Sequence, residues 1–144
     1  MDFDKYWKSL VNRIYKQKEL LTGPEERLYR LTCIYGETMV DGIEAYFDRR
    51  HAEFPADMDA LIDHGFADIA ADFRRAREVM FGDIELTDAS VVPIVSRLLD
   101  EDEADQPILD EINRIYGRLI TRLPDVIDVR DKIGVENGLF EGRS

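Results

Sequence analysis

The residues of this sequence that could do chemistry are few, apart from a large number of carboxylates. There is one cysteine, Cys33, and there are two histidines, His51 and His64. Nucleophilic catalysis needs a base beside the attacking Ser or Cys, and zinc sites need several Cys or His ligands. No Gly-x-Ser-x-Gly motif, phosphate-binding loop or dinucleotide-binding glycine motif occurs. The sequence therefore predicts no catalytic residue, no metal site and no cofactor.

The carboxylates are the most informative feature. The chain has 31 acidic and 19 basic side chains in 144 residues, a formal net charge of −12. Residues 1–50 are balanced, with 9 of each sign, whereas residues 51–100 carry −7 and residues 101–144 carry −5. Such a field repels nucleic acid and anionic membrane surfaces. It predicts a basic protein partner, with no direct contact to nucleic acid or to a membrane.

Within residues 37–72 the acids recur at helical spacing. Five pairs are four positions apart: Glu37/Asp41, Glu44/Asp48, Glu53/Asp57, Asp59/Asp63 and Asp68/Asp72. Residues four apart are neighbours on a helix surface. One interpretation is a row of carboxylates that replaces DNA phosphates in front of a basic protein; the other is a solvated face that keeps the chain soluble. The acids expected to contact a partner are Asp41, Glu44, Asp48, Glu53, Asp57, Asp59 and Asp63.

Arginines cluster at two places, Arg49-Arg50 and the segment that holds Arg74, Arg75 and Arg77. We expect solvated helix faces with ion pairs, such as Arg74 with Glu78.

The elements that carry these residues are predicted to be helices throughout. Apolar residues recur at three- and four-residue intervals, and no alternating strand pattern occurs. We therefore expect an all-α fold, a compact multi-helix single domain of about six to eight helices. The apolar stripes lie in residues 6–15, 28–50, 58–62, 66–80, 91–99, 109–123 and 126–133.

Several residues mark expected helix ends. Thr22 is expected to cap a helix, with Pro24 in its first turn and Glu25 as capping-box partner. Gly36 is expected to bend or end that helix, and Gly65 and Gly82 to close two later ones. Thr87 or Ser90 is expected to cap the helix containing Pro93, which lies either in its first turn or at a kink.

The chain is expected to be one domain over residues 1–136, with a loose tail over residues 137–144. A lone Cys33 between apolar helical positions is expected to be a small buried hydrophobe. Because it has no partner for an internal disulfide, and because no signal peptide or long apolar run occurs, the predicted location is the cytoplasm.

One segment resembles a known family. The run Tyr35-Gly36-Glu37-Thr38-Met39-Val40-Asp41-Gly42-Ile43-Glu44-Ala45-Tyr46-Phe47, followed later by Leu61-Ile62-Asp63-His64-Gly65-Phe66, is similar to the small acidic bacterial family that includes a DNA-mimic protein. The matching positions are Glu37, Gly42, Tyr46, Phe47 and Gly65. The family's asparagine, first glycine and glutamine are replaced by Val40, Asp41 and Ala45. The resemblance covers roughly residues 25–123.

The resemblance implies an all-α fold, a homodimer and binding to a transcriptional repressor in place of DNA. Together with the charge, it gives the first hypothesis: an acidic interaction domain that binds a basic DNA-binding protein. A second hypothesis is an immunity-type protein that neutralises a basic toxin or nuclease. A third is a small hydrolase or metal-binding protein that uses Glu37 and Asp41, with His51 or His64 beside them.

Overall fold

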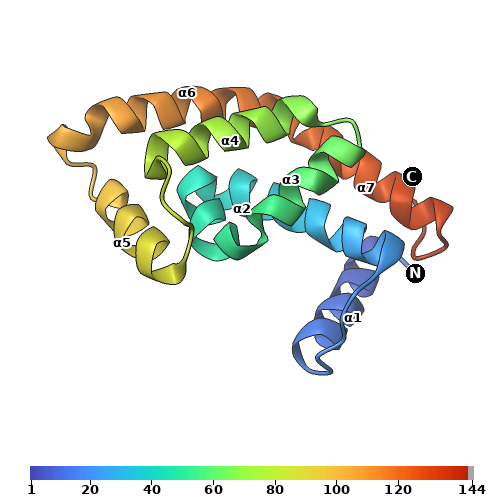
Figure 1. Ribbon diagram of the computed structural model, residues 1–144. Helices are drawn as coiled ribbons and strands as arrows, with labels where there is room; N and C mark the ends of the chain where they lie inside the picture. Colours follow the sequence, from blue (N-terminus) through green and yellow to red (C-terminus); the bar gives the residue numbers. More distant parts are fainter. Residues whose placement is uncertain (143–144) are drawn as a thin grey trace.

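The computed structural model describes residues 1–142, which form seven α-helices and no strand (Figure 1). The helices are α1 (Phe3–Tyr15), α2 (Gly23–Arg50), α3 (Phe54–Asp63), α4 (Ala67–Phe81), α5 (Asp88–Leu99), α6 (Gln106–Arg122) and α7 (Pro124–Glu136). Short 3₁₀ turns, His51–Glu53 and Glu103–Asp105, lead into α3 and α6. The all-α prediction with six to eight helices is confirmed.

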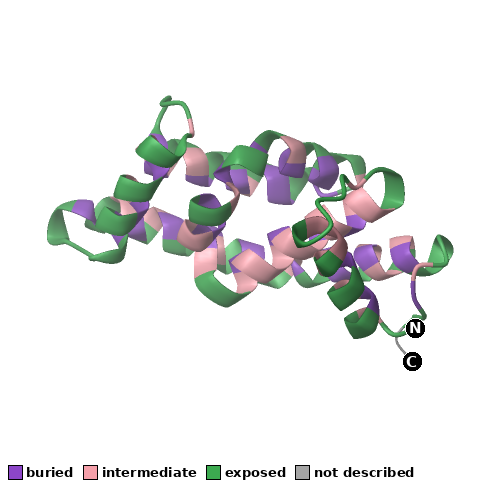
Figure 2. Ribbon diagram, turned by 90° about the horizontal axis from the view of Figure 1, so that it is seen from below, coloured by how far each residue is buried: buried purple, intermediate pink, exposed green. Residues whose placement is uncertain are grey.

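The long helix α2 is the centre of the structure. It contacts α3, α5, α6 and α7, while α4 packs along α6 (Figure 1). Its buried residues, among them Leu31, Ile34, Ile43 and Phe47, join apolar side chains from α3 to α7 in one continuous core. Burial is concentrated along the inner faces of the helices, and the outer faces are exposed (Figure 2). Removing this apolar surface from water is the main favourable term in folding.

A second, smaller cluster joins the two ends of the chain. Tyr6 and Leu10 of α1 pack with Leu28 of α2 and with Phe140, which follows α7. Ile133 of α7 contacts both this cluster and the main core. The two termini lie close together, and the Glu141 amide donates to the Met1 carbonyl at 2.8 Å (Figure 1).

The expected loose tail is therefore wrong for residues 137–142. Phe140 is buried, with its ring packed directly on Gly134, where a Cβ atom would overlap the ring. The glycine lets the segment fold back over α7, so that the apolar Leu139 and Phe140 leave water. Residues 143 and 144 of the expected tail lie outside the described residues.

Several helix ends are where the sequence placed them. Gly65 and Gly82 follow α3 and α4 with positive φ values of 89° and 63°, a conformation in which a Cβ atom is strained. Thr87 caps α5: its hydroxyl accepts from the Ser90 amide, and the Ser90 hydroxyl accepts from the Thr87 amide. Pro93 lies in the second turn of α5 rather than the first.

Two local predictions in α2 are wrong. The helix does begin behind Thr22 with Pro24 in its first turn, but the Thr22 side chain makes no capping bond. Glu25 is instead held by Arg13 of α1, whose guanidinium donates to both of its carboxylate oxygens at 2.8 Å. The backbone also departs from helical geometry at Gly42 (φ 91°, ψ 178°) and not at Gly36. The Gly42 kink redirects the last two turns of α2, which carry Glu44 and Asp48.

Within residues 1–142, no helix combines the length and the apolar character needed to cross a membrane.

Candidate acidic interface

The seven acids expected to contact a partner do not form one exposed row. Asp57 is fully buried, with 0% of its side chain exposed. It lies on the inner face of α3 with Phe54, Met58 and Leu61, which are also buried. A carboxylate without exposed surface cannot touch a protein partner, so Asp57 is removed from the expected contact set.

Asp57 belongs instead to an internal ion-pair network. Its Oδ1 accepts from Arg30 at 2.9 Å and from Arg50 at 2.8 Å, and its Oδ2 accepts from the Arg50 Nε at 2.9 Å. The Tyr46 hydroxyl donates to Oδ2 at 2.7 Å. Burial, followed by the charge of Asp57, raises the pKa of the Tyr46 phenol well above its ordinary value. The network ties both halves of α2 to α3 and satisfies the buried carboxylate.

Three more of the seven acids are neutralised by arginines. Arg49 donates to Asp41 at 2.7 Å and also to Glu37 at 2.5 Å, so it bridges one of the pairs spaced four apart. Glu53 pairs with Arg30 at 2.9 Å, and Asp63 pairs with Arg27 at 3.0 Å. In Asp68/Asp72, the last of the five pairs spaced four apart, both acids also form ion pairs. Asp68 pairs with Arg122 and Asp72 with Arg118, each at 2.9 Å.

One of the five pairs differs from the others. Neither Glu44 nor Asp48 has a basic side chain within ion-pair distance among the described residues. Asp48 is exposed, and Glu44 is half-buried at the rim of a polar recess of about 390 Å³. Asp59 on α3 is the third of the seven acids that makes no ion pair within residues 1–142, and its side chain is exposed.

The recess beside Glu44 is built where α2, α5 and α6 meet. Its walls are Glu44, Leu98, Leu99, Glu101, Gln106, Leu109 and Asn113. Glu101, in the connection from α5 to α6, also makes no ion pair within the described part of the chain. Two carboxylates without cationic partners therefore share this recess. It combines carboxylate and amide groups with leucine side chains.

The connection from α5 to α6 extends this negative surface. Asp100, Glu101, Asp102 and Glu103 are consecutive, exposed and without ion pairs among residues 1–142. Only Asp105, at its end, is buried, and it accepts from Arg97 at 3.2 Å. This connection lies at the opposite end of the molecule from the two termini (Figure 1). We call Glu44, Asp48 and Asp100–Glu103 the acidic end.

The α5–α6 connection is not among the contact acids predicted from the sequence, although its four consecutive acids, Asp100 to Glu103, are a signal in the sequence itself. The predicted contact acids were chosen by the four-residue spacing of carboxylates in residues 37–72. That spacing does not show where arginines from other helices will lie. Over residues 83–103 the chain carries seven carboxylates and one arginine, a net charge of −6. Half of the net charge of the protein therefore lies in 21 residues around α5.

The residues that match the family motif have structural positions. Tyr46 and Phe47 are fully buried in the core, Gly42 forms the kink, and Gly65 forms the turn between α3 and α4. Glu37 is held by Arg49. These contacts account for four of the five positions by packing or backbone geometry, and for Glu37 by an ion pair.

Among the described residues no group of three or more His, Cys, Asp or Glu side chains is placed to hold a metal. Arg49 lies against both Glu37 and Asp41, so the carboxylates of the hydrolase or metal hypothesis are already paired. Neither histidine joins them. His51 is buried, with its ring nitrogens 3.0 Å from the Phe47 carbonyl and 2.8 Å from Asp88.

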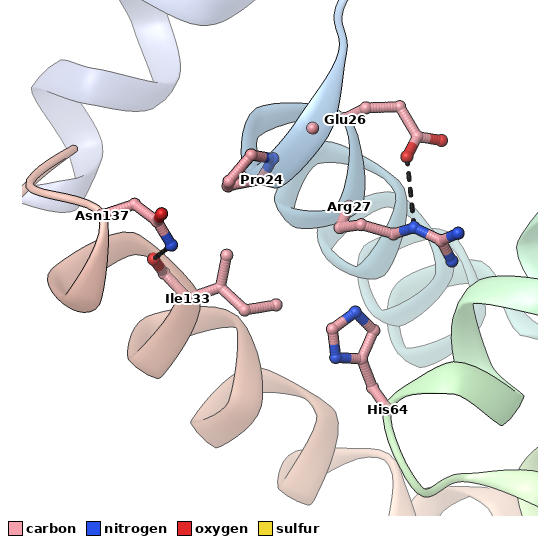
Figure 3. A pocket seen from close by; sticks show the side chains of 7 residues that line it. Pro24, Glu26, Arg27, His64, Ile133 and Asn137 are labelled. Carbon is pink, nitrogen blue, oxygen red and sulfur yellow. Dashed lines mark hydrogen bonds and ion pairs between the residues drawn. The ribbon is translucent and has the colours of Figure 1, made fainter.

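His64 lines a different recess, of about 490 Å³, between the first turn of α2 and the end of α7 (Figure 3). Pro24, Arg27, Ile133 and Asn137 face the same space (Figure 3). Burial, and then the charge of Arg27, lowers the pKa of the His64 imidazole, which favours the neutral ring. Arg27 is itself paired with Glu26 and Asp63, so the recess is not a strongly cationic site.

Cys33 is half-buried on α2, at the edge of a groove lined by Phe3, Trp7 and Val40. Burial raises the pKa of its thiol, which keeps it in the less reactive protonated form. The second arginine cluster also has partners within the chain: Arg75 meets Glu78 at 3.4 Å, in place of the expected Arg74–Glu78 pair, and Arg77 donates to the Gly82 and Ile84 carbonyls.

Comparisons with known protein families, with curated proteins and with solved structures each found no match. The resemblance to the DNA-mimic family therefore stays a prediction.

Proposed function

We propose that this protein binds a basic protein partner through its acidic end. The observation that supports the proposal is the uneven pairing of its carboxylates. Arginines of the same chain contact at least one carboxylate in four of the five helical pairs, whereas Glu44, Asp48 and Asp100–Glu103 have none. A carboxylate that is paired with an arginine attracts a basic partner only weakly, because the arginine cancels most of its electrostatic potential. A carboxylate without a counter-ion attracts such a partner more strongly.

The kind of partner follows from the sign and the arrangement of charge. Glu44 of α2 and Glu101 of the α5–α6 connection share a recess with amide groups. Asp48 lies one helical turn after Glu44, and Asp100, Asp102 and Glu103 flank Glu101 in the chain. Lysine and arginine side chains are the complementary groups, and such complementarity mainly increases association rate and specificity. A DNA-binding protein, whose basic surface normally meets phosphates, is the first candidate class. A basic nuclease or toxin is the second, and the same surface would serve it.

The test is affinity capture from the source cell at low salt with three forms of the protein. One is the native chain. The second carries Glu101→Gln, Asp102→Asn and Glu103→Gln at the acidic end. The third is a matched control with the same loss of charge at the opposite end, at Asp4→Asn, Glu136→Gln and Glu141→Gln.

We expect the native chain and the control to capture the same basic protein and the acidic-end variant to lose it. Equal capture by all three forms would contradict the proposal. Duplex DNA added to the captured complex then separates the two partner classes: a partner bound over its DNA site is released by its own DNA sequence, while a nuclease is identified by its activity.

A further inference from the structure

The outer face of α5 is an unpartnered apolar stripe. Ala89, Val92, Pro93 and Leu99 are exposed, apolar and at helical spacing, and the small polar Ser96 lies between Val92 and Leu99 on the same face. Val92 is 48% exposed and Leu99 is 65% exposed. The opposite face of α5, with Val91, Val95 and Leu98, is buried against the core. The helix is thus apolar on both faces, although only one of them meets the protein.

The composition of this face is not explained by the stability of the isolated helix. A β-branched residue such as Val92 has lower helix propensity than Ala, and exposure gives it no packing in return. Pro93 has no N–H, so the Ala89 carbonyl lacks its normal bond from the second turn. Single exposed apolar residues are ordinary, but a stripe that follows one helix face is typical of a contact surface.

Acids lie at both ends of the stripe. Glu85 and Asp88 are exposed at the start of α5, and Asp100 to Glu103 follow its last residue. Leu99 connects the two features, because it lies on the stripe and also lines the recess that holds Glu44 and Glu101. The only basic residue of the segment, Arg97, is paired with Asp105. The surface is therefore apolar along its middle and negative at both ends.

We propose that the outer face of α5 docks an amphipathic basic helix of the partner. This inference rests on the proposed function and adds the form of the ligand to it. The apolar face of such a helix covers Val92, Pro93 and Leu99, in the manner of a helix laid on an apolar surface. Its lysines or arginines meet the flanking acids, and one long basic side chain enters the recess, with its apolar stem along Leu99 and its charged head at Glu44 and Glu101.

Three synthetic probes separate charge from the apolar contact. The first is an 18-residue peptide of leucine and lysine whose leucines fall on one helix face. The second has the same composition in scrambled order, and the third is an oligolysine with the same number of lysines. Binding is measured by fluorescence anisotropy at low salt. Val92→Gln with Leu99→Gln removes the stripe, and Val40→Gln, at a position on α2 that is 78% exposed, is the matched control.

We expect the native chain to bind the amphipathic peptide about tenfold more tightly than the scrambled one, since burying two apolar side chains accounts for at least that factor. The Val92/Leu99 variant should bind both peptides equally, and the Val40 variant should behave as the native chain does. Circular dichroism of each variant checks that its helices are retained.

Equal affinity of the native chain for the amphipathic peptide, the scrambled peptide and oligolysine would overturn the docking inference while leaving the acidic interaction intact. Failure of all three probes to bind at low salt would overturn both. Amide shifts in the NMR spectrum locate the contact: changes along α5 support the inference, and changes confined to the groove between α1 and α2 contradict it.

Discussion

The substitution Asp57→Asn distinguishes an acid that stabilises the core through buried ion pairs from an acid that contacts a partner. Asparagine has nearly the same size as aspartate, but it removes the charge that holds Arg30 and Arg50. It also places N–H donors opposite those of the arginines. Because Asp57 is fully buried, we expect a large loss of stability and no direct effect on partner binding.

The magnitude follows from the contacts. Three charge-assisted bonds from Arg30 and Arg50 and one bond from Tyr46 converge on the carboxylate. Removing one partner of a buried ion pair costs about 3–5 kcal/mol. Arg30 keeps Glu26 and Glu53 as partners, and the Arg30 and Arg50 side chains remain 15% and 11% exposed, which places the loss near the lower limit. We therefore expect about 3 kcal/mol, or roughly 10 °C in melting temperature for a domain of this size.

Urea unfolding followed by far-ultraviolet circular dichroism measures this loss. Asp59→Asn is the matched control, because Asp59 lies on the same helix, is exposed and makes no ion pair among the described residues. Its effect should stay within about 0.5 kcal/mol. A loss below about 1 kcal/mol for Asp57→Asn would refute the buried-network reasoning. Weakened partner binding in a variant that is still folded would return Asp57 to the contact set.

Three further predictions concern the backbone and the acid range of stability. Gly134→Ala forces a Cβ atom into the Phe140 ring, so we expect thermal unfolding to show that the free energy of unfolding falls by about 2–3 kcal/mol. The control is Gly117→Ala, which has no atom within 4 Å of the new Cβ and should stabilise its helix. Gly42→Ala should lower the free energy of unfolding by about 1–3 kcal/mol because of the positive φ of Gly42. Gly36→Ala lies in regular helix and should raise it by up to about 1 kcal/mol. Urea unfolding that finds Gly42→Ala the more stable of the two variants would contradict the kink at Gly42. The hydrogen bonds from Arg13 hold the pKa of Glu25 below its ordinary 4.5, so its contribution to stability is present above that pH and lost as the pH falls through the folded value. Urea midpoints of the native chain and Glu25→Gln should therefore differ at pH 7 and converge as the pH falls below 4.5 and through the lowered pKa of Glu25; a constant difference would exclude the linkage.

The helical architecture could be predicted from the sequence because its signals are local. The 3.6-residue apolar period, together with Gly65 and Gly82 at helix ends, depends on near neighbours in the chain. Long-range partners were not visible in the same way. Glu25 has the spacing of a capping-box residue, yet Arg13 from another helix binds it. The sequence does not distinguish Gly36 from Gly42, and the packing of α2 decides at which of them the helix bends.

The candidate site was harder to predict because a carboxylate's role depends on what faces it. The position of Asp57 did contain a signal: it falls at helical spacing with Phe54, Met58 and Leu61 and hence on the buried face of α3. The arginines that neutralise Asp41, Glu53 and Asp63 come from other turns or other helices, and only the folded chain brings them there. The acidic end consists of carboxylates that have no such arginine partner.

The most direct test of the central claim is the salt dependence of partner binding. The affinity of the captured basic protein is measured between about 50 and 500 mM salt for the native chain and for the Glu101→Gln/Asp102→Asn/Glu103→Gln variant. Salt weakens interactions between exposed charges because the screening length falls from about 10 Å at 0.1 M to about 3 Å at 1 M. We predict weaker binding and a shallower salt dependence for the variant, with the native behaviour retained by the control altered at Asp4, Glu136 and Glu141. Identical salt dependence in all three proteins would contradict a binding surface at the acidic end.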